Sequence, residues 1–437
     1  MKRKIYDKLI RWKNNPLRKP LLLQGARQVG KTWIVKKFGS QEFDELIYLN
    51  FEQDPGLAGF FEGNLQAIKI IENLELYFGK KIKPESTLIF FDEIQAVPRA
   101  LTSMKYFYEQ NPEYHLIGAG SLLGVSVGKS TSFPVGKVSF LTLFPMDFDE
   151  FLIANGEEIL AGKIAGLTEK LPEVIHHKLI DYLKKYLFLG GMPEVVKTYI
   201  DTRDFALARN IQNEILEAYQ RDFSKYSEKK QVVKTLEFWH SIPYQLAKEN
   251  KKFKYSDIHK RARSAYYEQT LEWLKNAGLI YPAYQVSVPK IPLSGYSDRS
   301  KFKVYLSDTG LLGAMLQISL KNIAFPEKIF SEYNGAFIEN FVASQLTANG
   351  FKELFYWKSK SDAEVDFLIT FNEKIFPLEV KSGSHLRSKS LRSYQSKYQP
   401  ELSIRISPAN YEKSGNFINI PLYETTHIKT IIDKNTN

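Results

Sequence analysis

Short apolar runs alternate with amphipathic helical periodicity through roughly the first third of the chain. Runs of this length are typical of buried strands, and apolar positions repeating every three to four residues indicate helices between them. Such alternation predicts an α/β fold with a parallel sheet and helices on both of its faces. We expect its strands at residues 21–24, 46–51, 87–91, 114–119 and 138–143.

The pattern changes after about residue 155. A short helix is expected at 147–154, and 173–250 reads as helical, with Gly190 to Pro193 as punctuation between two long helices. The segments that follow predict a winged helix-turn-helix: helices at 255–263 and 264–276, strands at 279–286 and 301–307, and a tip rich in Pro, Gly and Ser at 288–300.

The last part of the chain returns to mixed periodicity, which predicts a separate small α/β domain. Its helices are expected at 335–348 and 386–397, and its strands at 353–358, 363–371, 375–381, 402–406 and 418–423. We therefore divide the chain into three predicted domains at 1–160, 161–325 and 326–437. This division fits 437 residues, more than a single hydrophobic core usually fills.

The composition indicates the cellular compartment and the expected binding partners of the protein. The chain has no cysteine, which excludes disulfides and cysteine-ligated zinc and favours a reducing compartment, so we expect a cytoplasmic protein. It has neither a signal-peptide pattern nor an apolar run long enough for a membrane span. A net charge of +11 makes nucleic acid the first expected partner.

The strongest chemical signal follows the first predicted strand, where the sequence fits the G-x-x-x-x-G-K-T phosphate-binding loop. The glycines let backbone N–H groups point at phosphate oxygens, the lysine reaches the β and γ phosphates, and the threonine hydroxyl binds Mg²⁺. The predicted nucleotide-binding residues are Gly25, Ala26, Arg27, Gln28, Val29, Gly30, Lys31 and Thr32.

Two carboxylates and a hydroxyl complete the predicted catalytic site. Asp92 and Glu93 end the buried strand at 87–91, where the first would order Mg²⁺ and the second would polarise the attacking water. Ser121 follows the next strand. Its hydroxyl either senses the γ phosphate or aligns the water, or it caps the helix expected after it.

These motifs resemble AAA-type ATPases of the prokaryotic group related to origin-recognition and signal-transduction ATPases. More narrowly, the chain resembles uncharacterised bacterial and archaeal ATPases with a fused C-terminal domain of unknown function. The resemblance runs nearly end to end and rests on Gly25-Ala-Arg-Gln-Val-Gly-Lys-Thr32, Phe91-Asp-Glu-Ile-Gln95, Gly120-Ser121, Gly190-Gly-Met-Pro193, Val304-Tyr-Leu-Ser-Asp-Thr-Gly-Leu-Leu312 and Leu378-Glu-Val-Lys-Ser-Gly383.

The resemblance implies that the nucleotide is ATP. It also implies a homo-oligomer, because relatives complete the site with an arginine from a neighbouring subunit. Arg99 and Lys137 are both candidates for that role, and the sequence does not choose between them.

The predicted winged helix carries a basic cluster with interleaved tyrosines, which indicates either contact with DNA phosphates or a protein-docking surface. The basic residues are Lys248, Lys251, Lys252, Lys254, Lys260, Arg261 and Arg263.

The last domain resembles restriction-endonuclease-like folds in its order of acidic residues. Asp366 lies on one predicted strand, and Glu379 and Lys381 share one face of the next, which a turn near Asn372 brings alongside. Glu339 on the preceding helix is a further carboxylate. The set predicts either a Mg²⁺-dependent nuclease site or an inactive domain kept for binding.

Taken together, the sequence predicts a Mg²⁺-dependent ATPase whose hydrolysis moves a winged-helix and nuclease-like module on or near DNA. Two alternatives stay open at this point. One is a nucleotide-gated switch with slow hydrolysis that times binding to DNA or a protein, and the other is an ATP-controlled DNA endonuclease.

Overall fold

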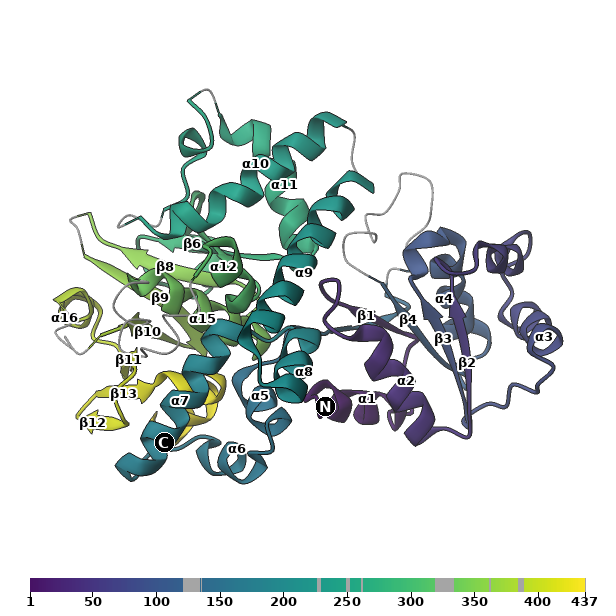
Figure 1. Ribbon diagram of the computed structural model, residues 1–437, viewed down its shortest axis with the longest axis horizontal. Coiled ribbons are helices and arrows are strands. Elements are labelled where there is room, and N and C mark those ends of the chain that lie inside the picture. Colours follow the sequence, from purple (N-terminus) through teal and green to yellow (C-terminus); the bar gives the residue numbers. More distant parts are fainter. Residues whose placement is uncertain are drawn as a thin grey trace. The chain divides into compact units, whose positions relative to one another are not determined.

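The computed structural model describes residues 1–120, 134, 136–225, 229–248, 252–260, 262–318, 334–360, 363–383 and 389–436. The chain divides into two compact units (Figure 1): residues 1–144 with 276–278, and residues 145–275 with 279–437. Within the described ranges, no helix combines the length and apolar character that a membrane crossing requires.

The first unit is a five-stranded parallel sheet in the order β2-β3-β4-β1-β5. All five strands expected from the sequence are present, with ends within two residues of the predicted ones. They are β1 (Leu21–Gln24), β2 (Glu45–Asn50), β3 (Thr87–Asp92), β4 (His115–Ala119) and β5 (Ser139–Thr142). The predicted α/β class of this unit is confirmed.

Helices cover both faces of this sheet (Figure 1): α1 (Ile5–Lys13) and α2 (Lys31–Glu42) on one side, α3 (Ala67–Phe78) and α4 (Pro98–Gln110) on the other. All six residues of β3 are consequently buried. This explains why its sequence is a continuous apolar run rather than an alternating one. The run ends at the carboxylate of Asp92, at the carboxyl edge of the sheet.

The second unit contains most of the helices. They are α5 (Phe148–Ala154), α6 (Glu158–Ile164), α7 (Glu173–Leu189), α8 (Pro193–Thr202), α9 (Phe205–Lys225), α10 (Lys229–Leu246), α11 (Ser264–Asn276, whose last residue groups with the first unit), α12 (Thr309–Met315), α15 (Asn334–Ala348), α16 (Lys389–Tyr398) and α17 (Ile428–Thr436). The expected short helix at 147–154 is present, with Asp147 as its N-cap.

An eight-stranded mixed sheet in the order β12-β13-β11-β10-β9-β8-β6-β7 joins the middle of the chain to its end. Its strands are β6 (Ile280–Val286), β7 (Ser297–Leu306), β8 (Leu354–Lys358), β9 (Glu364–Phe371), β10 (Lys374–Val380), β11 (Ser403–Ser407), β12 (Glu412–Ser414) and β13 (Phe417–Pro421).

This sheet crosses the predicted boundary between the second and third domains. Strand β6 of the expected wing pairs in parallel with β8 of the tail, so the hairpin extends the tail's sheet. The boundary itself, between residues 325 and 326, lies outside the described residues. Residues 145–160, which we had placed in the first domain, group with the second unit.

The helix expected at 255–263 is not found: its described residues contain only the short 3-10 helix Tyr255–Asp257. The chain just before it is held in an extended course, because Phe253 N donates to Phe302 O at 2.8 Å. The rings of Phe253 and Phe302 also stack, with centroids 5.6 Å apart. The second expected helix, at 264–276, is present as α11.

Two motifs that lie far apart in the sequence meet at the buried carboxylate of Asp308. Its Oδ2 accepts from Gly191 N at 2.6 Å and its Oδ1 accepts from Leu311 N at 2.9 Å, which caps α12. Gly190 has a φ of 73°, and a Cβ there would come 2.2 Å from Asp308 Oδ1. The glycines at 190–191 therefore let α7 and α12 approach closely.

We expect Asp308→Asn to alter the pH dependence of stability. Burial raises the pKa of Asp308 to about 6, whereas the unfolded chain ionises near its ordinary value of about 3.9. The free energy of unfolding of the wild type, relative to that of the variant, is therefore highest below about pH 4. This difference falls by about 3 kcal/mol as the pH rises through 6. Urea unfolding of both proteins between pH 4 and 7 measures this difference, and a constant difference would contradict the assignment.

Candidate functional site

The phosphate-binding loop joins β1 to α2 through backbone that only glycine adopts readily. Gly25 has a φ of 149°, and a Cβ at this position would lie 2.2 Å from Leu143 O. Gly30 has a φ of 93° and is the residue immediately before the helix. Loop N–H groups and the positive end of the α2 dipole thus lie where the sequence predicted a phosphate cradle.

Lys31 is the most deeply buried charged side chain of this loop, with 7% of its surface exposed. Its Nζ donates to Ala26 O at 2.8 Å and to Gly25 O at 3.1 Å. Burial lowers the pKa of Lys31 to about 8, against the opposing effect of Glu93 and Asp92. Phosphate oxygens would be stronger acceptors than these two carbonyls. We therefore expect the ammonium to bind phosphate oxygens in their place when a nucleotide is present.

Thr32 and Asp92 meet directly beside the loop. Thr32 Oγ1 donates to Asp92 Oδ2 at 2.8 Å, and the Tyr48 hydroxyl donates to the same oxygen at 3.1 Å. Burial raises the pKa of Asp92 above its usual value, and these hydrogen bonds act in the opposite direction. A hydroxyl and a carboxylate at the end of a phosphate loop are oxygen ligands that suit Mg²⁺, so the residues present fit that ion.

Glu93 stands at the edge of the site in a conformation that is uncommon outside glycine, with φ 50° and ψ 43°. Its Oε2 accepts from Gln95 Nε2 at 2.5 Å. Gln95 also lies against the end of β4, since a Cβ on Gly120 would come 2.4 Å from Gln95 Oε1. Ser121, the predicted hydroxyl at this end of β4, lies outside the described residues.

Gln95 is a site residue that the sequence analysis did not single out. It appears only as the last letter of the quoted Phe91-Asp-Glu-Ile-Gln95 motif. A polar residue two positions after a catalytic carboxylate is a weak signal, because surface turns contain many such residues. Its contact with Glu93 follows from the short 3-10 helix Ile94–Ala96, which folds the chain back toward the carboxylate.

The two candidates for a basic residue donated between subunits both have partners within the first unit. Arg99 Nε donates to Phe61 O and its Nη2 to Gly63 O, each at 2.6 Å. Lys137 forms an ion pair with Glu109 at 2.9 Å. These contacts give both side chains structural roles in a single subunit.

Family models match three segments of the chain. Residues 17–152 match the family model described as AAA domain. This part of the chain is similar to AAA domains, which supports a P-loop ATPase. Residues 180–322 and 334–424 match two further models, each described as a domain of unknown function (DUF8612 and DUF4143). Neither description confirms a winged helix or a nuclease, and both identities stay predictions from the sequence.

Two curated relatives match a shorter stretch. They are the uncharacterized proteins Mb2031c of Mycobacterium bovis and Rv2008c of Mycobacterium tuberculosis, each 34% identical over 104 residues. The match covers 23% of this chain and 22% of each relative. It therefore leaves the function of the whole protein open.

Similar solved structures include a Walker-type ATPase of Pyrococcus abyssi, at 15% identity and a TM-score of 0.45, covering 71% of this chain and 94% of that one. The Aeropyrum pernix ORC1 protein, solved in complex with DNA, has 13% identity and a TM-score of 0.29, with 72% and 91% covered. At these scores the likenesses carry no conclusion about what this chain binds.

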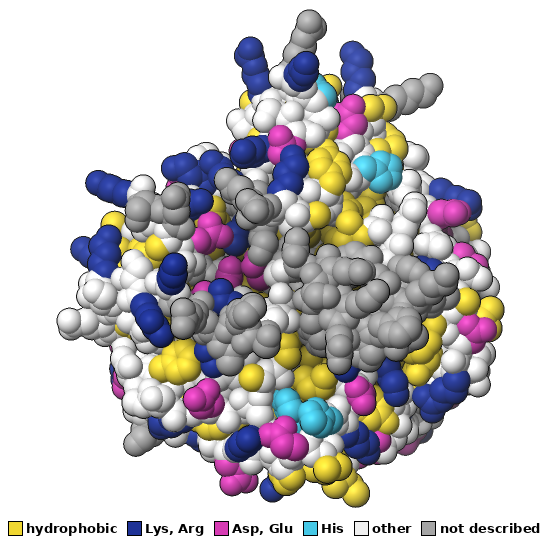
Figure 2. Space-filling view, turned by 60° about the vertical axis from the view of Figure 1, so that its left-hand side comes forward, with side chains coloured by type: hydrophobic (Ala, Val, Ile, Leu, Met, Phe, Trp, Pro, Cys, Tyr) yellow, Lys and Arg dark blue, Asp and Glu magenta, His cyan; other side chains and the backbone are white. Residues whose placement is uncertain are grey.

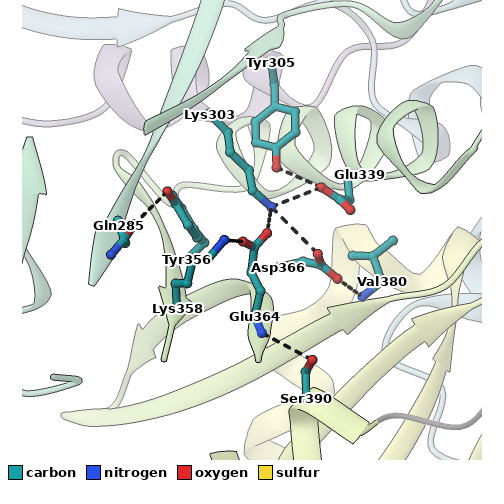
Figure 3. Close-up of polar contacts among 10 residues, drawn as sticks. All are labelled: Gln285, Lys303, Tyr305, Glu339, Tyr356, Lys358, Glu364, Asp366, Val380 and Ser390. Carbon is teal, nitrogen blue, oxygen red and sulfur yellow. Dashed lines mark hydrogen bonds and ion pairs between the residues drawn. The ribbon is translucent and has the colours of Figure 1, made fainter. Parts of the chain in front are cut away.

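The predicted nuclease-like residues lie in the second unit, and two of them, Glu339 and Asp366, contact a lysine that the sequence analysis did not consider (Figure 3). The antiparallel pairing of β9 and β10 through Asn372 and Glu373 is present as expected. Asp366 Oδ2 accepts from Val380 N at 2.8 Å. On β10, Glu379 is 3% exposed and pairs with Lys381 at 2.6 Å.

Glu339 and Asp366 face a common cation, Lys303 of β7. Burial alone lowers the pKa of Lys303, but the carboxylates of Glu339, Glu364 and Asp366 together raise it well above the ordinary value. The described residues contain no group of three or more acidic or histidine side chains arranged to hold a metal ion. Lys303 and Glu364 carry no recognised motif in the sequence, so only the fold reveals them.

Proposed function

We propose that the protein hydrolyses ATP at the phosphate-binding loop with the help of Mg²⁺. The observation that carries this proposal is the direct contact of Thr32 with Asp92 beside a loop whose Gly25 permits no side chain. Bound Mg²⁺ would supply charge neutralisation between the β and γ phosphates. The other groups that we propose to act in hydrolysis are side chains and backbone amides of this chain.

Each of these groups has a distinct role in the proposed reaction. Loop amides hold the phosphate oxygens, and Lys31 leaves the carbonyls of Gly25 and Ala26 to bind the β and γ phosphates. Glu93 orients the attacking water and accepts hydrogen bonding from it, once Gln95 releases or shares its carboxylate. The position of Glu93 directly after Asp92, at the strand end, supports this proposed role.

We further propose that the nucleotide cycle controls contact with DNA through the basic region around α11. Figure 2 shows Lys and Arg side chains gathered at the top of this face, the height at which α10 and α11 lie in Figure 1. Lys254, Lys260 and Arg263, which lie just before α11, are exposed. Exposed cations in the segment that precedes a helix suit phosphate contacts that do not depend on base sequence.

Not every lysine of the predicted basic cluster is available. Lys248 pairs with Asp257 at 2.8 Å, and Lys252 is only partly exposed. Lys251 and Arg261 lie outside the described residues. The proposal for DNA therefore rests on Lys254, Lys260 and Arg263.

The triple variant Lys254→Gln, Lys260→Gln, Arg263→Gln is expected to bind duplex DNA more weakly than wild type. Each phosphate contact contributes a slope of about 0.9 to the dependence of log affinity on log salt, so the slope should fall by up to about 3. Fluorescence anisotropy across a salt series measures both quantities. The loss should be uniform across DNA sequences, because phosphate contacts carry no base information.

A control with the same change in charge is Lys163→Gln, Lys170→Gln, Lys197→Gln, which removes three exposed lysines elsewhere on the second unit. Equal losses in the two triple variants would show that net charge alone governs binding, and the proposed surface would be wrong. If the wild type does not bind DNA at low salt, the basic region serves a protein partner instead.

A further inference from the structure

A buried ammonium group lies among three carboxylates, two of which, Glu339 and Asp366, the sequence predicted for a possible Mg²⁺ site (Figure 3). Lys303 Nζ lies 2.6 Å from Glu364 Oε1, 3.6 Å from Glu339 Oε2 and 3.9 Å from Asp366 Oδ1. Lys303 and Glu339 are 1% and 2% exposed, whereas the side chains of Glu364 and Asp366 are partly exposed, so the ammonium itself has almost no contact with bulk water.

The lysine comes from outside the predicted nuclease-like domain. It lies on β7, whereas the carboxylates belong to helix α15 and strand β9. Its contact with Glu364 is an ion pair, since the geometry gives Lys303 Nζ no aligned hydrogen bond among the described residues. The ring of Tyr356, 4.9 Å from the same nitrogen, adds a cation–π contact.

The surrounding groups hold the carboxylates in this arrangement. The Tyr305 hydroxyl donates to Glu339 Oε2 at 3.1 Å, and Lys358 Nζ lies 3.5 Å from Glu364 Oε2. The second oxygen of Asp366, Oδ2, accepts a hydrogen bond from the backbone N–H of Val380. Three carboxylates thus face two ammonium groups, and each carboxylate has a further protein partner of its own.

This set does not fit a divalent metal. Mg²⁺ requires an octahedral shell of oxygens at about 2.1 Å, and here a positively charged nitrogen lies among the three carboxylates, 2.6 to 3.9 Å from their oxygens. A divalent ion beside it would face direct like-charge repulsion in a poorly hydrated site. The observed distances are those of an ion-pair network around a buried lysine.

We propose that Lys303 is the resident cation of this cluster and takes the place of a divalent metal. The lysine ties the β6–β7 hairpin to α15 and β9, so the acidic residues serve the junction between hairpin and tail. The inference is independent of ATP hydrolysis, because it concerns residues of the second unit alone.

The test is direct binding of Mn²⁺ to the nucleotide-free, full-length chain, followed by electron paramagnetic resonance of the free ion. All proteins carry Asp92→Asn, which removes the metal ligand of the nucleotide site. The parent with Lys303 should bind no Mn²⁺ that depends on Asp366. Lys303→Met, which keeps the length of the side chain but removes its charge, should gain one Mn²⁺ site with at least tenfold higher affinity than the parent.

Adding Asp366→Asn to the Lys303→Met protein should abolish the gained site. A folded Lys303→Met protein that gains no Mn²⁺ would overturn the claim that the ammonium stands in a metal position. If that variant fails to fold, comparison of the parent with its Asp366→Asn derivative decides. Equal Mn²⁺ binding by these two supports the proposal, and a site lost with Asp366 overturns it.

Discussion

Lys31→Ala is expected to bind ATP at least about 100-fold more weakly than wild type. Lys31 is the buried cation of the loop, and its ammonium donates to the carbonyls of Gly25 and Ala26. Removing it deletes two charge-assisted hydrogen bonds to phosphate, each worth about 1.5–3 kcal/mol, and every 1.4 kcal/mol is tenfold in affinity. Titration with a fluorescent ATP analogue in the presence of Mg²⁺ measures the loss.

A suitable control is Lys83→Ala, which removes an exposed lysine of the same unit. This variant should bind the analogue as wild type does. Circular dichroism of both variants should match the wild type, because the hydrogen bonds of Lys31 are made within the loop itself. Wild-type affinity in folded Lys31→Ala protein would exclude this loop as the nucleotide site.

Glu93→Gln is expected to bind ATP normally but to hydrolyse it about 10²- to 10⁴-fold more slowly. The amide keeps the size of the side chain and its contact partner Gln95, but it cannot accept a proton or polarise water as a carboxylate does. Asp92 and Thr32 are untouched, so binding through Mg²⁺ should persist. Phosphate release under saturating ATP measures turnover, and the fluorescent analogue measures binding in the same samples.

The matching control is Glu62→Gln, an exposed carboxylate of the same unit, which should hydrolyse ATP at the wild-type rate. Turnover by Glu93→Gln equal to that of wild type would remove Glu93 from the chemistry. Loss of binding as well as turnover would instead indicate that Glu93 supports the loop rather than the water.

The local sequence pattern was sufficient to predict the fold of the first unit. Strands such as β3 are buried on both faces and so read as continuous apolar runs, and a parallel sheet brings their carboxyl ends to one edge. From that alone, Thr32 and Asp92 were expected near each other, and their side chains lie 2.8 Å apart. The motif spacing contained this information because strand, loop and helix are consecutive in the chain.

Contacts between distant segments could not be predicted from the sequence. The parallel pairing of β6 with β8 joins residues some seventy positions apart, a relation that no local periodicity encodes. Lys303 and Glu364 came to notice only through that pairing. Gln95 was missed for a different reason, since its role depends on how the chain turns back after Glu93.

The most direct test of the central claim is isothermal titration calorimetry of the wild-type, full-length protein with ATP and Mg²⁺. We predict saturable binding of one nucleotide per chain, which is lost in Lys31→Ala and retained in Glu93→Gln. The absence of any binding heat from folded wild-type protein, with ATP at several temperatures, would contradict the account.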